Sequence, residues 1–551
     1  MPTIQFQFKD LCSLLGKKIT IEQLDKLGEY GKAELESYDK ATDTVTMSCG
    51  DTAMPYLWSV EGLARLFKGV LGLEQGIPVL KVDKTKDTII VDKSVNDVRP
   101  HIAMFSAKGQ QVTDDLLRQM IQLQEKLDTG FGRKRRKISI GIYRGKDVAF
   151  PVTYKAVKSS EIKFIPLGFS KPLNLAQILK EHPTGQKYAS TLDGMDKYPV
   201  LVDAKDRVLA FIPIINSNDL GKVEIGDSDL QVEVSGTDEE AVDVATNILA
   251  YAFADRGFKI GSVTIKSNGA EKVTPFDYKN TIKISPEQVK ALIGIDLSRQ
   301  EINALLETAR YSVVKDVIHI PSYRADILHP VDVIEDIAVM YGYDKVPIAP
   351  LTSYTAGDVM HIAALSKRTR EILVGFGMQE VLSAVLSNKQ TLYDKMCCPD
   401  TGTVEIKEYM SESYSCVRTW LIPILMDVLS KNKHHVYPQR IFEQGLVTVR
   451  KGKETHDYER IASVICGAEI DYTAIRQVAD ALLNALGVEY AVEETEHPSF
   501  IAGRVARITV KGKGVAYLGE IHPKVLGNFD IQLPVAVFEL NLTDLMALQK
   551  K

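Results

Sequence analysis

The most restrictive feature of this sequence is a short stretch, residues 271–347, in which local signals mark where helices begin. Ser285-Pro286-Glu287-Gln288 and Ser298-Arg299-Gln300-Glu301 are two tandem capping boxes. In such a box the serine and the Gln or Glu three residues later each satisfy the other's backbone N–H. A strand follows at 317–321 and a third helix begins near Pro330. This order of elements predicts a small winged-helix-like module.

The rest of the chain predicts an α+β multidomain fold. Its 551 residues suffice for roughly three to five domains. We expect an N-terminal α+β domain with a linker at 1–97, an α+β domain at 98–270, the winged-helix-like module at 271–347 and a further α+β region at 348–551. Hydrophobic spacing predicts helices at 113–128, 366–375 and 473–486, a hairpin at 506–521, and a linker or exposed strand pair at 82–97.

Composition narrows the class of protein. Lys and Arg number 67 against 72 Asp and Glu, a net charge of −5, which excludes a basic nucleic-acid coat over the whole chain. The six cysteines form no CxxC pair, which argues against a disulfide framework or a thiolate zinc site. No apolar run approaches the ~18 residues that span a bilayer, and the N-terminus does not resemble a signal peptide. We therefore expect a cytoplasmic protein without membrane association.

Four carboxylates around the third helix of the module form a candidate metal site. Asp332, Glu335 and Asp336 share one helix face through their i, i+3, i+4 spacing, and Asp326 lies in the loop that enters the helix. A set of oxygen ligands without His or Cys suits Mg²⁺. The alternative is that acids in the first turns of a helix only complement its dipole.

Two further patterns have open interpretations. The basic run 133–137 could contact nucleic-acid phosphates, or it could be a solvated turn between a helix and a strand. Leu230, Val232 and Val234 alternate with polar residues, which predicts a strand with one buried face and one wet face. The chain has no phosphate loop, nucleophile elbow, HExxH or GxGxxG motif, so it shows no active site of its own.

Several segments, in order along nearly the whole chain, resemble one family. They are SVEGLARLFKG (59–69), IQLQEKLDTGFGRKRRKISIG (121–141), PIINSNDLGK (213–222), EVSGTD (233–238), PSYRADILHPVDVIEDIAVMYGYDKVP (321–347), RTWLIPILMDVLSKNK (418–433), IFEQG (441–445) and LGEIHPKVLGNF (518–529). This set is similar to the β subunit of phenylalanyl-tRNA synthetase, in its archaeal and eukaryotic cytosolic form.

The resemblance implies a ligase subunit rather than a complete enzyme. It implies pairing with a catalytic α subunit in an α₂β₂ tetramer, which joins phenylalanine to tRNA(Phe) with ATP and Mg²⁺, with ATP and phenylalanine bound mainly by α. It places magnesium ligands at Asp326, Asp332, Glu335 and Asp336. It also implies that region 348–551 is a class II synthetase-like antiparallel core that has lost catalysis, so no aminoacylation residues are expected here.

The resemblance further implies that domain 98–270 hydrolyses tyrosine mis-attached to the tRNA. The pocket for this editing reaction would involve Asn216, Ser217 and Glu233. The chain departs from the family pattern nearby, because the family usually has His at the positions of Asp128, Tyr143 and Ser190, and Asp at that of Arg144. The alternative functions are a free-standing tRNA-binding or scaffolding paralogue, or a hydrolase of mischarged tRNA that acts without a ligase partner.

Overall fold

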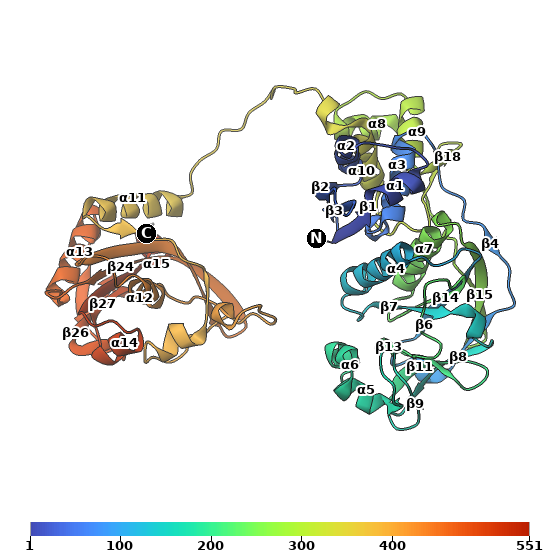
Figure 1. The fold of residues 1–551 in the computed structure, drawn as a ribbon. Coiled ribbons are helices and arrows are strands. Elements are labelled where there is room, and N and C mark those ends of the chain that lie inside the picture. Colours follow the sequence, from blue (N-terminus) through green and yellow to red (C-terminus); the bar gives the residue numbers. More distant parts are fainter. Residues whose placement is uncertain (1, 550–551) are drawn as a thin grey trace. The chain divides into compact units, whose positions relative to one another are not determined.

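The computed structural model describes residues 2–549 and divides the chain into two compact units, residues 1–349 and 350–551 (Figure 1). Residues 347–360 join them without helix or strand. Both units combine helices with largely antiparallel sheets, which confirms the α+β multidomain expectation. None of the helices in the described residues is long and apolar enough to cross a membrane.

The first unit begins with a three-stranded antiparallel sheet in the order β1-β3-β2. Its elements are β1 (Thr3–Gln7), α1 (Phe8–Leu15), α2 (Ile21–Tyr30), β2 (Ala33–Asp39), β3 (Thr44–Cys49) and α3 (Val60–Val70). Leu24, Met47 and Phe67 pack in a core that is continuous with the sheet that follows.

An 11-stranded sheet forms the middle of this unit. Nine of the strands form a continuous row of hydrogen-bonded neighbours, in the order β13 (Ile215–Asn216), β12 (Val208–Phe211), β11 (Tyr198–Val202), β8 (Val152–Val157), β5 (Thr88–Val91), β15 (Lys259–Ser267), β6 (His101–Lys108), β14 (Asp229–Gly236) and β7 (Ile138–Arg144). The other two strands, β4 (Val82–Asp83) and β16 (Ala270–Thr274), each pair with β15. Helices α4 (Asp114–Lys126) and α7 (Glu239–Asp255) cover one side of β6, β7 and β14 (Figure 1). Helices α5 (Leu175–Glu181) and α6 (Pro183–Tyr188) and the pair β9 (Lys163–Phe164) and β10 (Leu173–Asn174) lie near β11–β13.

Two expectations for this sheet need correction. Segment 82–97 is an exposed strand and connection only in its first part, β4 and residues 84–87, whereas β5 lies inside the sheet between β8 and β15 and its Ile89 is fully buried. Strand β14 has no wet face: Gln231, Glu233 and Ser235, on the side opposite Leu230 and Val232, are at most 2% exposed. The polar alternation therefore marks a buried polar layer.

The module at the end of the first unit contains the predicted helices. Both capping boxes are present, at the starts of α8 (Pro286–Ile293) and α9 (Arg299–Thr308), and α10 (Pro330–Tyr341) is the third helix. The expected strand is β19 (Val317–His319), which joins β17 (Thr281–Ile282) and β18 (Ser312–Val314) in a three-stranded sheet.

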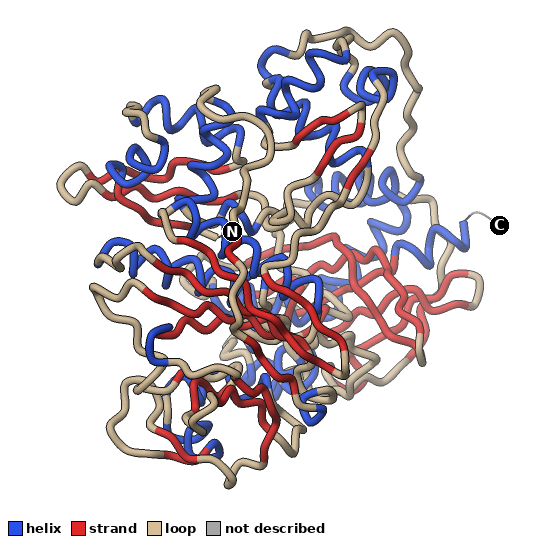
Figure 2. Tube along the Cα trace, turned by 90° about the vertical axis from the view of Figure 1, so that its right-hand side faces the viewer, coloured by secondary structure: helices blue, strands red, loops and turns tan. Residues whose placement is uncertain are grey.

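The second unit is a seven-stranded sheet covered by helices on both faces. The strand order is β20 (Gln379–Glu380), β23 (Gln439–Lys451), β24 (Glu454–Cys466), β28 (Val535–Asn541), β27 (Lys513–Ile521), β26 (Phe500–Val510) and β25 (Ala491–Glu494). One face packs on α11 (His361–Gly375), α13 (Tyr472–Ala485) and α15 (Leu542–Gln549), the other on α12 (Ile422–Lys431) and α14 (Pro523–Asn528). A small pair, β21 (Leu386–Ser387) and β22 (Cys416–Val417), lies apart. The predicted hairpin and both predicted helices are confirmed, with α11 starting five residues early; Figure 2 shows the strands in red.

Candidate functional site

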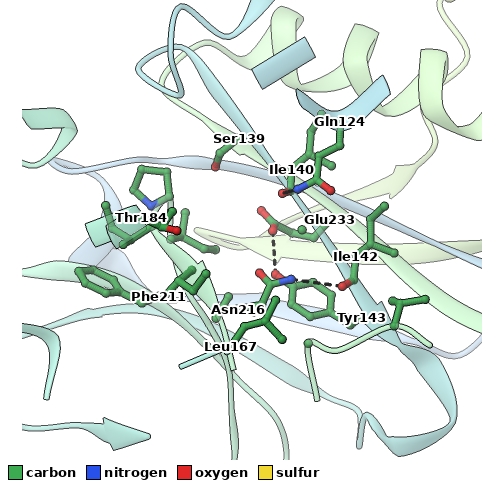
Figure 3. A pocket seen from close by; sticks show the side chains of 18 of the residues that line it. Gln124, Ser139, Ile140, Ile142, Tyr143, Leu167, Thr184, Phe211, Asn216 and Glu233 are labelled. Atoms are coloured by element: carbon green, nitrogen blue, oxygen red, sulfur yellow. Dashed lines mark hydrogen bonds between the residues drawn. The ribbon is translucent and has the colours of Figure 1, made fainter. Parts of the chain in front are cut away.

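A cavity of about 270 Å³ opens in the 98–270 region, between β7 and β14 on one side and β12–β13 on the other (Figure 3). Asn216 and Glu233, two of the three predicted pocket residues, both line it. The third, Ser217, is buried but is not among the lining residues; its hydroxyl accepts from the backbone N–H of Leu220. The structure thus brings together two of the three predicted side chains.

The central contact of the cavity joins Glu233 to Tyr143. The phenol of Tyr143 donates to Glu233 Oε2 at 3.0 Å, and both side chains are buried. The two residues lie on paired strands, with Gly141 directly opposite Glu233. A Cβ at Gly141 would come within 2.2 Å of the Tyr143 hydroxyl, so glycine is what allows the tyrosine ring to reach the carboxylate.

Burial dominates the protonation of this site. It raises the pKa of Glu233 from its ordinary 4.5 to about 7, although the Tyr143 hydroxyl opposes the shift. Glu233 Oε1 is buried and has no hydrogen-bond partner among the described residues. A carboxyl group with a pKa near neutrality can take up or release a proton at physiological pH, which is the requirement for general acid–base chemistry.

Asn216 has a positioning contact of its own. Its side-chain amide donates to the carbonyl of Ile142 at 3.2 Å, which ties β13 to β7 across the cavity (Figure 3). A Cβ at Gly221 would lie 2.3 Å from the Cβ of Asn216, so the turn after β13 closes tightly on this residue. The asparagine therefore ties this wall of the cavity to β7, the strand that pairs with the Glu233 strand β14.

In the basic run 133–137, the side chain of Arg135 is mostly buried. Arg135 lies 2.9 Å from the buried Asp128 and donates to the carbonyls of Pro213 and Ile214 at 3.0 and 2.9 Å. Burial raises the pKa of Asp128 to about 7 even beside this guanidinium. Arg135 supports the cavity and is not available to a phosphate, whereas Arg133, Lys134 and Arg136 are exposed.

The remaining departures from the family pattern lie away from the cavity. Arg144 forms ion pairs with Glu224 at 3.0 Å and Asp227 at 3.3 Å, and Ser190 is exposed in a short turn after α6. Sequence reasoning missed Gly141 and Arg135 as parts of the site. Gly141 could have been recognised from the sequence, because a glycine two residues before a tyrosine on the same strand leaves room for the tyrosine ring.

The four carboxylates proposed for Mg²⁺ divide into two pairs. Asp326 and Asp336 are buried on the guanidinium of Arg324, which contacts both, at 2.6 Å for Asp336. Asp336 also accepts from the Tyr311 hydroxyl at 2.6 Å. Their charge is thus neutralised inside the protein by a buried arginine.

The other two carboxylates face outward. Asp332 Oδ2 accepts from the backbone N–H groups of Leu328 and His329 at 2.8 and 2.7 Å and so caps α10. Glu335 is half exposed and pairs with Lys32 at 2.8 Å. Within residues 2–549 no three such side chains converge as a ready metal site, so the donor chemistry suits Mg²⁺ but the present arrangement does not form its coordination shell.

Two family models match parts of this chain. Residues 282–343 match the model of the tRNA synthetase B5 domain, and residues 347–542 match that of the phenylalanyl tRNA synthetase beta chain CLM domain. Both models describe modules of aminoacyl-tRNA synthetases, which places the mixed α+β units described above in that class.

Full-length relatives identify the family. The chain is 38% identical to the phenylalanine–tRNA ligase beta subunit of Pyrococcus abyssi and 36% identical to that of Methanococcoides burtonii, in each case over 99% of this chain and all of the relative. The crystal structure of an N-terminal fragment of the Pyrococcus horikoshii phenylalanyl-tRNA synthetase beta subunit superposes with a TM-score of 0.60 at 35% identity, covering 62% of this chain and the whole fragment. The chain belongs to the phenylalanine–tRNA ligase β-subunit family.

Proposed function

We propose that this chain works in the cytoplasm beside a catalytic α subunit, which attaches phenylalanine to tRNA(Phe) with ATP. The observation that carries the proposal is the match to phenylalanine–tRNA ligase beta subunits along 99% of the chain. We assign the 271–347 module as winged-helix-like and the second unit as a class II synthetase-like core without catalysis. In this assignment the second unit supports the catalytic domain of α.

An exposed apolar surface on the second unit supports a partner of this kind. Large apolar side chains are exposed around the β21–β22 pair, namely Leu382, Val385, Leu386, Tyr409, Met410 and Tyr414. Clustered apolar exposure marks a protein interface rather than a free surface. We propose that the α subunit covers this surface in an α₂β₂ tetramer.

The test is assembly. The chain is co-expressed with a candidate α subunit and the mass of the purified species is measured by light scattering. We expect an α₂β₂ mass for the wild type and for Val273→Glu, an exposed apolar residue on the first unit, and dissociation for Leu382→Glu. A chain that stays alone and monodisperse would favour a free-standing paralogue instead.

We propose Mg²⁺ as the cofactor of the α10 carboxylates. Asp332 and Glu335 face outward, and Mg²⁺ is commonly held by one or two carboxylates with water in its other positions. Binding of the ion would require Lys32 to release Glu335. Asp326 and Asp336 would not contact the ion while they remain paired with Arg324. The ion would supply positive charge at a subunit junction.

The metal test uses assembly as its readout. Asp332→Ala combined with Glu335→Ala should weaken association with α and remove the effect of EDTA on the mass of the complex. Glu287→Ala combined with Asp296→Ala removes two exposed acids of the same module. This control should change neither the association with α nor the effect of EDTA. Unchanged assembly and unchanged EDTA sensitivity in the first double variant would reject the metal assignment.

We also propose that the cavity of residues 98–270 hydrolyses tyrosine mis-attached to tRNA(Phe). An amino acid that differs only by a hydroxyl is hard to reject by binding alone, so a second, hydrolytic site is physically reasonable. Glu233 supports this role through its raised pKa and its place in the wall of the cavity. Replacing a general acid–base group usually costs about 10²–10⁴ in rate.

The hydrolysis test compares two carboxyl-to-amide variants of the intact complex. Glu233→Gln should slow release of tyrosine from Tyr-tRNA(Phe) by about 100-fold or more. Glu224→Gln, an exposed glutamate of the same domain, should leave the rate unchanged. Equal rates in the wild type and both variants would exclude Glu233 from the reaction.

A further inference from the structure

The second unit contains a cavity of about 410 Å³ that none of the functions above uses. It lies on the face of the sheet that packs on α12, toward one end of the strands. Strands β24, β26, β27 and β28 contribute lining residues. Its volume is within the range of small-molecule sites in proteins.

Four polar residues and one alanine form a row across this face of the sheet. The strand registers place Arg507, Tyr517, Glu539, Ala462 and Glu443 side by side on five consecutive strands. The next row toward the other end is Val505, Gly519, Val537, Val464 and Ile441, which is apolar and belongs to the core. A sheet face built only for packing would continue this apolar pattern.

The carboxylates at the cavity are already neutralised. Glu539 pairs with Arg460 at 3.0 Å and accepts from the backbone N–H groups of Leu421 and Ile422, both at 3.0 Å. Asp544 pairs with Lys513 at 3.1 Å and accepts from the side-chain amide of Asn541. Neither acid is left to bind a cationic ligand.

Arg507 is the charged lining residue whose charge is not balanced. Within residues 2–549 it has no carboxylate partner in ion-pair contact; its guanidinium donates to the carbonyl of Gly514 and lies 4.0 Å from the centre of the Tyr517 ring. A Cβ at Gly514 would come within 2.2 Å of Arg507 Nε, so this glycine makes room for the flat guanidinium. The arginine is therefore held in place with its charge facing the cavity.

Aromatic rings form the wall beside this cation. The His497 ring lies 5.8 Å from Trp420, 5.2 Å from Phe500 and 5.5 Å from Tyr517, and all four residues line the cavity. Burial, together with the charge of Arg507, lowers the pKa of His497, so the imidazole is neutral at pH 7 and acts as an aromatic surface. Aromatic pairs of this kind favour stacked or edge-on contact with a further ring.

We infer that this cavity binds a planar aromatic anion, with its ring against Trp420, His497 and Tyr517 and its phosphate or carboxylate on Arg507. A charge-assisted contact from a fixed guanidinium gives both affinity and orientation. The site is separate from the cavity of residues 98–270 and does not depend on hydrolysis there.

The experiment uses the complex of this chain with its α subunit and measures binding by calorimetry. The probes are AMP, an aromatic ring with a phosphate, and 3-phenylpropanoate, an aromatic ring with a carboxylate. The β variants are Arg507→Gln, Tyr517→Leu and the control Arg504→Gln, an arginine of the same strand that pairs with Glu520 at 2.7 Å. Because α is identical in every complex, any difference belongs to β.

We expect at least one probe to bind the wild type and the Arg504→Gln complex equally, and to bind Arg507→Gln about tenfold or more weakly. Tyr517→Leu should also weaken binding, and it provides the test if Arg507→Gln does not assemble. The probe that responds identifies the anion as a phosphate or a carboxylate. Identical isotherms for all complexes with both probes would overturn the inference.

Discussion

Removing the Tyr143 hydroxyl tests how the buried Glu233 carboxyl group is stabilised in the cavity. Tyr143→Phe leaves Glu233 buried and removes the phenol that donates to it at 3.0 Å. A hydrogen bond to a charged group contributes about 1.5–3 kcal/mol and one between neutral groups about 1 kcal/mol. The substitution should therefore cost more above the pKa of Glu233, about 7, than below it.

The sign of the pH effect follows from the same shift. The folded protein binds the Glu233 proton more tightly than the unfolded chain, so this group contributes stability that is complete below pH 4.5 and is lost as pH rises through about 7. A shift of this size corresponds to about 3 kcal/mol. Tyr143→Phe should raise the pKa of Glu233 further and extend the loss to higher pH. The raised pKa of Asp128 gives a pH dependence of stability of the same sign, in the wild type and in Tyr143→Phe alike.

The matched control is Tyr154→Phe. The Tyr154 phenol is equally buried but donates to the backbone carbonyl of Arg99 at 2.8 Å, which does not titrate. Its removal should cost about 1 kcal/mol at every pH.

The assay is urea unfolding at pH 6 and pH 8 in a Trp420→Phe background, which leaves Trp58 as the fluorophore of the first unit. We expect Tyr143→Phe to cost about 1 kcal/mol at pH 6 and about 2–3 kcal/mol at pH 8. Equal, pH-independent losses for Tyr143→Phe and Tyr154→Phe would show that the Tyr143 phenol does not act through the ionisation of Glu233.

Three further predictions concern other contacts. Gly141→Ala should displace the Tyr143 ring, because its Cβ would lie 2.2 Å from the phenol oxygen, and lower the thermal midpoint of the first unit; an unchanged midpoint would contradict this. Arg418→Met should destabilise the second unit by about 3–5 kcal/mol in chemical denaturation, because it leaves the buried Glu443 without the guanidinium 2.5 Å away. Adding Glu443→Leu to that variant should recover most of the loss, and no recovery would argue against an uncompensated charge. Ser298→Ala should cost about 1 kcal/mol through loss of the α9 cap, measured by the same method, with an exposed serine such as Ser190→Ala as the neutral comparison.

Local signals predicted local structure well. The capping boxes at Ser285 and Ser298 and the hairpin at 506–521 depend on residues close in sequence, and all three are present. The placement of β5 between β8 and β15 depends on partners far along the chain, and periodicity alone did not indicate it.

In the two candidate sites, too, the sequence indicated individual residues but not their contacts with distant parts of the chain. The resemblance located Asn216 and Glu233, but the Tyr143–Glu233 contact joins residues 90 positions apart and required the strand register. Spacing placed Asp332, Glu335 and Asp336 on one helix face, yet it could not show that Glu335 meets Lys32, 303 positions away, or that Arg324 neutralises the buried Asp336 together with Asp326. Charge partners from distant segments decide which carboxylates stay free.

Phenylalanylation of tRNA(Phe), measured with this chain alone, with the α subunit alone and with both together, tests most directly whether the chain is a ligase subunit. We expect charging only in the mixture, in a species of α₂β₂ mass. Charging by α alone at the rate of the mixture, or an inactive mixture in which no complex forms, would contradict this expectation.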